Sequence, residues 1–239
     1  MLIKNIGFMK KQGIYAGLFL LLAGFLTNCN KQQTTENAVQ NTPAGFAKTS
    51  LIAGGGCDGC ELMYAGIPAI INPVDTSPGW REAGQKLLIS GTVYQIDGKT
   101  PANNVILYYW QTDNNGYYSP KAGMNENAKK HGHIRGWVKT AQNGNYRIYT
   151  IRPAPYPNDN LPAHIHMAVK EPNINNEYYI DDITFEDDTL LAPYTLKHPV
   201  ENRGGSGVVK PALQNGVQIA TRNIICGFHI PNYPAGAGQ

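Results

Sequence analysis

Two histidines separated by one residue are the first feature of the sequence that could do chemistry. His164 and His166 follow Pro162 in the stretch PAHIHM. Residues i and i+2 of an extended strand point to the same face, so the two imidazoles would emerge side by side. Imidazole is a common ligand of transition metals. The pair alone is a weak signal, because such pairs are more often structural, and its neighbours decide whether it indicates a metal site.

A tyrosine in a rigid loop strengthens the metal interpretation. Tyr156 lies between Pro155 and Pro157, whose rings restrict the backbone. A phenol ordinarily titrates near ~10, but as a phenolate it binds a hard trivalent cation that compensates its charge. The stretch NNGYYSP offers a second phenol at Tyr117 or Tyr118, and only one would serve because neighbours on an extended chain face opposite ways. Two imidazoles and two phenolates would suit ferric iron.

A second histidine pair has a different environment. His131 and His133 lie close to Lys129, Lys130 and Arg135. The positive charges of these side chains oppose the binding of a cation. We therefore predict no metal role for this pair.

The body of the chain has the pattern of an all-β protein. Runs of β-branched and aromatic residues alternate with turn signals such as Asp97-Gly98. No segment shows a sustained helical period of apolar residues with caps. The pattern predicts an antiparallel β-sandwich with strands within 86–95, 104–111, 145–151, 164–170, 177–185 and 217–226. Paired tyrosines in these runs are expected to be half-buried packing residues: Tyr108, Tyr109, Tyr178 and Tyr179.

The N-terminal segment has the pattern of an export signal followed by a tether. Two lysines precede an apolar run at 14–25, which is too short for a comfortable membrane span of about 20 residues. The sequence LTNC that follows resembles the site at which bacterial lipoproteins are cleaved and acylated. The chain would thus be exported and held at a membrane of the bacterial cell envelope by its lipid. The predicted organisation is a signal peptide at 1–28, a lipidated Cys29, a flexible polar tether at 29–50 and a β-sandwich domain at 51–239.

The net charge gives no indication of a nucleic-acid partner. The formal charge of +3 comes from 20 basic and 17 acidic residues. Three of the basic residues, Lys4, Lys10 and Lys11, lie upstream of Cys29, so the processed chain has 20 − 3 = 17 basic and 17 acidic residues. A neutral chain gives no reason to expect nucleic-acid binding.

Three cysteines remain after Cys29 is set aside for the lipid. Cys57 and Cys60 form a CxxC pair, and Cys226 is distant in sequence. An exported chain meets an oxidising compartment, where three thiols allow at most one intramolecular disulfide. We favour a bridge that involves Cys226. A bridge within the CxxC pair is the alternative, and metal or redox chemistry is a third.

Three stretches together carry a family resemblance. LLISGTVYQIDGKTPANNVILYYWQTDNNGYYSP is followed by HIRGWVKTAQNGNYRIYTIRPAPYP and then by PAHIHMAV. In this order they resemble the intradiol ring-cleavage dioxygenases, over about residues 87–185. The resemblance implies a β-sandwich that holds non-haem ferric iron, Fe(3+), through two tyrosines and two histidines. Matching the motifs position by position assigns these ligands to Tyr118, Tyr156, His164 and His166.

The resemblance also implies an activity. A catechol-type aromatic would bind the iron in place of Tyr156, and the leaving phenolate would take up a catechol proton. Tyr156 would therefore be both a ligand and a base. Dioxygen would attack the ring, and both of its atoms would enter the product as the ring opens between the two hydroxyls. The implied partners are a small aromatic substrate and O2, and members of the family often form homo-oligomers.

The sequence departs from the family at one position. The family usually has an arginine three residues before the first histidine, where a guanidinium stabilises charge on the substrate, and this chain has Leu161 there. Arg135, Arg152 and Arg203 are possible replacements. We predict Arg203 as a catalytic residue, because the glycines after it let a loop approach closely.

Acidic residues and the leucine leave other interpretations open. Asp181 and Asp182 would either disfavour an anionic substrate or lie at a solvated strand end. Leu161 favours a binding protein that keeps the fold but turns nothing over. A third interpretation has zinc or copper held by His164 and His166 alone, with no contribution from either tyrosine.

Overall fold

The computed structural model describes residues 52–57 and 59–236. The predicted signal peptide at 1–28, the lipidated Cys29 and the tether at 29–50 lie outside these residues and stay predictions. In the part of the chain that is described, no helix is long and apolar enough to cross a membrane.

Strands form where the runs of β-branched and aromatic residues predicted them. Within the described ranges the strands are β1 (Val74–Thr76), β2 (Lys86–Tyr94), β3 (Ile106–Gln111), β4 (Arg135–Lys139), β5 (Asn145–Ile151), β6 (His164–Lys170), β7 (Tyr178–Phe185), β8 (Val208–Val209), β9 (Ala212–Gln214), β10 (Val217–Thr221) and β11 (Ile224–Ile225). The helical segments are the 3-10 helices η1 (Cys60–Tyr64), η2 (Pro78–Arg81) and η3 (Glu126–His131), and the α-helix α1 (Leu191–Thr195). The short strand β4 was not predicted, because it contains a glycine and two basic residues.

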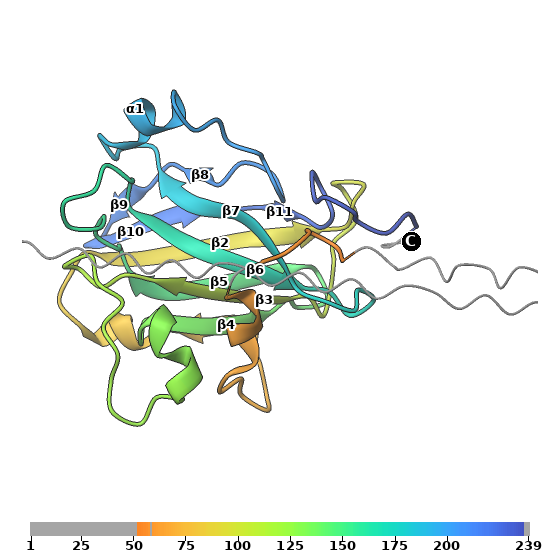
Figure 1. Ribbon diagram of the computed structural model, residues 1–239, viewed down its shortest axis with the longest axis horizontal. Helices are drawn as coiled ribbons and strands as arrows, with labels where there is room; N and C mark the ends of the chain where they lie inside the picture. Colours follow the sequence, from red (N-terminus) through yellow and green to blue (C-terminus); the bar gives the residue numbers. More distant parts are fainter. Residues whose placement is uncertain (1–51, 58, 237–239) are drawn as a thin grey trace, which may run out of the picture. The chain divides into compact units, whose positions relative to one another are not determined.

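The strands form two stacked sheets, which confirms the predicted all-β sandwich (Figure 1). One sheet has the order β1-β5-β2-β10-β9, with β11 also paired to β2, and the other has the order β4-β3-β6-β7-β8. The long central strands pair antiparallel. Four pairs are parallel, namely β1 with β5, β10 with β2, β11 with β2, and β8 with β7. The sequence did not predict them, because the direction of a strand depends on the path of the connection that leads to it.

The main core lies between the two sheets and follows the alternation of side chains along the strands. Leu87 and Ile89 of β2 and Ile165 and Met167 of β6 are all buried in it. Neighbouring residues of a strand face opposite ways. Because Ile165 and Met167 point into the core, the residues that alternate with them, His164 and His166, point to the outer face. The histidines of β6 are therefore presented on the outer face of the five-stranded sheet.

A second apolar cluster covers part of that outer face. It joins residues of β3, β6 and η1, namely Cys60, Met63, Tyr108, Trp110 and Ala168, with Cys57, Ile106, Tyr118, Trp137 and Tyr179 partly buried against them. In Figure 1 the orange segment that contains η1 and the green segment that contains η3 lie beside β4, away from α1. This outer cluster packs directly beside the residues that the sequence predicted as ligands.

The disulfide joins the two near cysteines, so the favoured bridge to Cys226 was wrong. Cys57 and Cys60 are bonded, with Cα atoms 5.5 Å apart, and Cys226 is free and buried. Cys226 follows β11 into the core between the sheets, whereas Cys57 and Cys60 lie in the outer cluster. The five-stranded sheet separates the two positions, so no bridge between them can form.

Replacing both bonded cysteines by serine should lower the free energy of unfolding by about 2 kcal/mol, because the closed loop is short. Chemical denaturation under oxidising conditions measures the difference. As a control, a reductant should lower the stability of the unmodified chain and leave the Cys57→Ser/Cys60→Ser variant unchanged. Equal stability of the two chains under oxidising conditions would contradict the prediction.

The ring of His131 packs against the aromatic residues of the outer cluster. Its ring stacks on Trp110 with centroids 4.1 Å apart, and its Nδ1 lies 2.8 Å from the hydroxyl of Tyr108. Arg135 donates to the same hydroxyl at 2.9 Å. Burial lowers the pKa of His131 from 6.5 to about 4, with smaller contributions from nearby positive groups.

The depressed pKa of His131 makes the fold sensitive to acid. Between pH 6.5 and about 4 the unfolded chain binds this proton and the folded chain does not, so the contribution is present above pH 6.5 and lost as the pH falls. The unmodified chain should therefore lose about 2 kcal/mol of unfolding free energy through His131 when the pH falls from about 7 to about 5. We expect the His131→Gln variant to be spared this loss. Denaturation curves at both pH values test this, with the exposed His198→Gln as the control that should behave like the unmodified chain.

Candidate metal centre

Four side-chain atoms meet on the outer face of the five-stranded sheet. The hydroxyl oxygens of Tyr118 and Tyr156 are 2.7 Å apart, and Tyr156 Oη lies 3.2 Å from His164 Nε2. His164 Nε2 lies 3.2 Å from His166 Nε2, which in turn lies 2.8 Å from Tyr118 Oη. These four atoms, here called the four-atom cluster, belong to the residues that the sequence predicted as ligands. Of the two adjacent tyrosines, Tyr118 contributes its hydroxyl oxygen to the cluster, while Tyr117 is 56% exposed.

The two tyrosines come from loops that are held against each other. Asp113, just after β3, accepts hydrogen bonds from the backbone N–H groups of Asn115 and Tyr117 and from the hydroxyl of Ser119. This winds the loop so that Tyr118 faces inward. Gly116 has a φ of 85° and packs on the loop of Tyr156, where a Cβ atom would come within 2.9 Å of Pro157 Cδ. Glycine is therefore required at this close approach.

Hydrogen bonds behind each imidazole orient the histidines. His164 Nδ1 lies 2.8 Å from the carbonyl oxygen of Pro162, so we assign the ring proton to Nδ1. His166 Nδ1 lies 3.0 Å from Asp182 Oδ1 and takes the same assignment. In both rings the lone pair of Nε2 then points into the four-atom cluster, as in metal-binding histidines.

A β-bulge brings two residues of β7 to the back of His166. Ile165 pairs with Ile183 and Met167 with Ile180, so β7 uses one more residue than β6 over this step. Tyr179 and Asp182 consequently both reach His166 Nδ1, at 2.7 and 3.0 Å. Tyr179 also donates to the carboxylate of Asp182. The acid lies within 4.8 Å of the histidine atoms, as a metal ligand could, but it contacts the nitrogen that faces away from the four-atom cluster and so orients the ring.

Burial disfavours the charged forms of the two phenols and of His164 when no metal ion compensates their charge. It raises the pKa of Tyr118 well above its usual value, and the hydroxyl of Tyr156 adds to this rise. Burial also raises the pKa of Tyr156 and lowers the pKa of His164, which His166 lowers further. A cation at the cluster would reverse the balance for the phenols, because it would favour their charged form.

The donor set of the cluster fits one metal ion. Two imidazole nitrogens whose lone pairs face each other at 3.2 Å repel unless a cation lies between them. Donor atoms bound at about 2.0–2.2 Å to a common ion lie about 3 Å apart, and the four contacts of 2.7–3.2 Å match that separation. The two phenol oxygens favour a hard cation over the softer ions that histidines alone would select.

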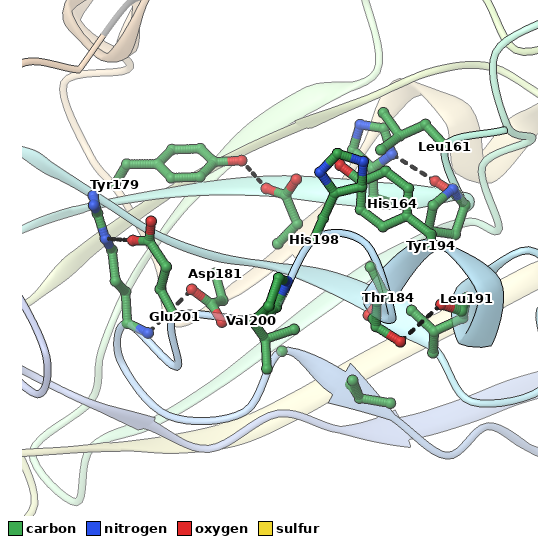
Figure 2. Close-up of a pocket in the computed structure, with 17 residues that line it drawn as sticks. Leu161, His164, Tyr179, Asp181, Thr184, Leu191, Tyr194, His198, Val200 and Glu201 are labelled. Atoms are coloured by element: carbon green, nitrogen blue, oxygen red, sulfur yellow. Dashed lines mark hydrogen bonds and ion pairs between the residues drawn. The ribbon is translucent and has the colours of Figure 1, made fainter. Parts of the chain in front are cut away.

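A cavity of about 340 Å³ opens beside the four-atom cluster, with His164 in its wall (Figure 2). Leu161 and Arg203 also line it, and the Nε of Arg203 forms an ion pair with Glu201. The other two candidate arginines have different partners, and neither is among the described residues that line the cavity. Arg135 packs on the rings of Tyr108 and Trp137, and Arg152 binds Asp187 at 2.7 Å.

Sequence reasoning missed several residues that position the cluster. Tyr179 was predicted to be only a packing residue, and Asp182 to be a pocket acid or a solvated strand end, yet both hold His166. Trp110 stacks on the ring of His166 with centroids 4.8 Å apart. The second histidine pair lies outside the four-atom cluster, and His133 binds Glu82 at 2.7 Å. No local signal marks the bulge that brings Tyr179 and Asp182 together.

Known proteins match the part of the chain that contains the four residues of the cluster. A family model described as Dioxygenase matches residues 68–203. The chain is 30% identical over 124 residues to catechol 1,2-dioxygenase of Acinetobacter baylyi, a match that covers 45% of this chain and 39% of that protein. It is 27% identical over 160 residues to catechol 1,2-dioxygenase 1 of Acinetobacter lwoffii, covering 58% of this chain and 50% of that protein. The chain thus spans half or less of the length of these curated relatives.

A solved structure shares the fold. The dioxygenase domain of a dioxygenase carbohydrate-binding protein fusion from Streptomyces sp. SirexAA-E is similar with a TM-score of 0.50 at 19% identity. The similarity covers 66% of this chain and 90% of that domain. The family match extends over more than half of the chain and includes all four residues of the cluster, and on this ground the chain belongs to the intradiol dioxygenase family.

Proposed function

We propose that the protein is a non-haem iron(III)-dependent dioxygenase that opens the ring of a catechol-type aromatic between its two hydroxyls. The four-atom cluster carries the proposal, because it joins two phenols and two correctly oriented imidazoles. The curated relatives are catechol 1,2-dioxygenases, which supports the same substrate class. Both atoms of O2 enter the product, the bond between the two hydroxyl-bearing carbons breaks, and each of these carbons becomes a carboxyl carbon.

The side chains of the cluster have distinct tasks in this reaction. Tyr118, Tyr156, His164 and His166 would hold the iron, which when bound supplies the charge that favours a catecholate and its reaction with O2. Tyr156 would also accept a proton at its phenolate oxygen from a catechol hydroxyl. Burial raises the pKa of Tyr156, so its phenolate would favour taking up this proton once it has left the ion.

The cavity would hold the ring beside His164. Arg203 contributes the guanidinium that lines it, and we propose that this residue stabilises negative charge on the substrate. Its ion pair with Glu201 reduces the charge that it offers. The export signal and the lipid at Cys29 complete the proposal with a membrane-tethered form, which rests on the N-terminal sequence alone.

The visible absorption spectrum of the iron-loaded chain tests the proposal. We expect a broad charge-transfer band that shifts when catechol is added without oxygen, followed by oxygen uptake when air is admitted. Tyr118→Phe and Tyr156→Phe should each weaken the band, because each removes a phenolate, while Tyr117→Phe is the matched control that should leave it unchanged.

The outcomes separate the three functions. A colourless folded chain after iron loading would sink the dioxygenase proposal. Metal content that survives both tyrosine substitutions would instead indicate a zinc or copper site on the histidines. A normal band without oxygen uptake for any simple catechol would indicate a binding protein.

Replacing Asp182 by asparagine should weaken iron binding by about 10–100-fold, because the neutral amide no longer strengthens His166 as a ligand. Competition with an iron chelator measures the change. Glu186→Gln, which removes an exposed carboxylate paired with Lys210, is the control. Equal affinities for the Asp182→Asn variant and the unmodified chain would show that the carboxylate has no part in holding the ligand.

A further inference from the structure

The cavity beside His164 is larger than a bare catechol needs. A cavity of roughly 150 Å³ is enough to bind benzene, whereas this one measures about 340 Å³. Of the four residues of the cluster, His164 alone also lines the cavity, so the cavity adjoins the cluster at this ring. A substituent that extends past His164 from a ring held at the cluster would enter the cavity.

Much of the cavity wall is apolar and uncovered. Leu161 and Leu191 are partly buried, while Val200 is 51% and Val208 37% exposed. Figure 2 shows Leu161 near His164, with Val200 further along the cavity. Apolar side chains exposed in a concave wall favour a ligand whose own surface is apolar.

Stacked rings also form part of this wall. Tyr194 and His198 have ring centroids 4.4 Å apart and an angle of 26° between their planes. Both line the cavity and lie close to Leu161 in Figure 2. Their faces add further surface that an apolar group can contact.

The charged groups of the cavity already have partners. Arg203 pairs with Glu201, and Asp182 holds His166. The carboxylate of Asp181 accepts hydrogen bonds from the backbone N–H groups of Asn202 and Arg203, at 2.8 and 3.0 Å. A carboxylate on the substrate would therefore meet three acids and an arginine that is already paired.

A second arginine lies near these acids but does not line the cavity. Arg222 is 2% exposed, and burial lowers the pKa of its guanidinium, while Tyr146 and Asp181 oppose this shift. Its guanidinium donates to the backbone oxygens of Ser206 and Asn223. The donors of Arg222 are thus directed at backbone oxygens, and the described residues that line the cavity do not include it.

We propose that the cavity selects catechols that carry an uncharged apolar substituent and rejects those whose substituent ends in a carboxylate. The inference rests on the proposed function, because His164 must hold the metal to which the catechol binds. The specificity-determining groups are the apolar wall, which binds the substituent, and Glu201, which neutralises the arginine that a carboxylate would need.

Binding of a catechol series to the full iron-loaded chain, purified in detergent and kept free of oxygen, tests the proposal. The probes are catechol, 4-methyl-, 4-ethyl- and 4-propylcatechol, and 3-(3,4-dihydroxyphenyl)propanoate. Titrations followed by the visible spectrum give each Kd. We expect Kd to fall about fourfold for each added carbon, and the propanoate to bind about 10-fold more weakly than propylcatechol.

One substitution tests the role of charge separately from that of the apolar wall. Glu201→Gln frees Arg203 and should tighten the binding of the propanoate about fivefold more than that of propylcatechol, because only the propanoate carries a carboxylate into the cavity. Glu186→Gln removes the same charge outside the cavity and should change neither Kd. An unchanged propanoate Kd in the Glu201→Gln variant would contradict the assigned role of Glu201.

The failure of this inference differs from the failure of the proposed function. Equal Kd values along the alkyl series, or a propanoate that binds as tightly as propylcatechol, would overturn the selectivity while catechol binding upheld the function. A spectrum that responds to none of the probes, catechol included, would overturn the function and the selectivity with it.

Discussion

Two imidazole nitrogens face each other at 3.2 Å with their lone pairs directed into the same space, and the rest of the site is arranged around this contact. Such a contact is repulsive in the absence of a cation, so the chain must hold each ring from behind. The carbonyl of Pro162 does so for His164, and Asp182 with Tyr179 does so for His166. Hydrogen bonds at the backs of the rings thus keep the lone pairs directed at the position of a metal ion.

The aromatic residues on the outer face of the five-stranded sheet also help to hold the histidine rings in place. Trp110 stacks on His166 on one side and on His131 on the other, which restrains the plane of the ligand ring. The disulfide and η1 cover this aromatic layer and exclude water from it. With the core on the inner face and this cluster on the outer face, β3 and β6 are covered on both sides, and the two histidines of β6 have little freedom to move.

The four-atom cluster and the cavity beside it have different chemistry. Near the four-atom cluster the side chains are polar and oriented by hydrogen bonds, whereas further along the wall they are apolar and partly exposed. Leu161 lies in this wall, at the position where the family usually has an arginine. The guanidinium of the cavity comes instead from Arg203, on the segment before β8, and its pairing with Glu201 makes it a weaker anion site than a free arginine.

The sequence by itself determined the features that depend on neighbouring residues of the chain. The period of two along β6 placed both histidines on one face, the prolines marked the rigid loop of Tyr156, and the family motifs distinguished Tyr118 from Tyr117. Only the tertiary structure decided that Cys57 pairs with Cys60, that a bulge brings Tyr179 and Asp182 to His166, and that Arg203 reaches the cavity whereas Arg135 and Arg152 do not. Local patterns report the direction of each side chain along its own strand. The meeting of distant groups depends on strand register and on how the loops return, and these are settled only when the two sheets pack.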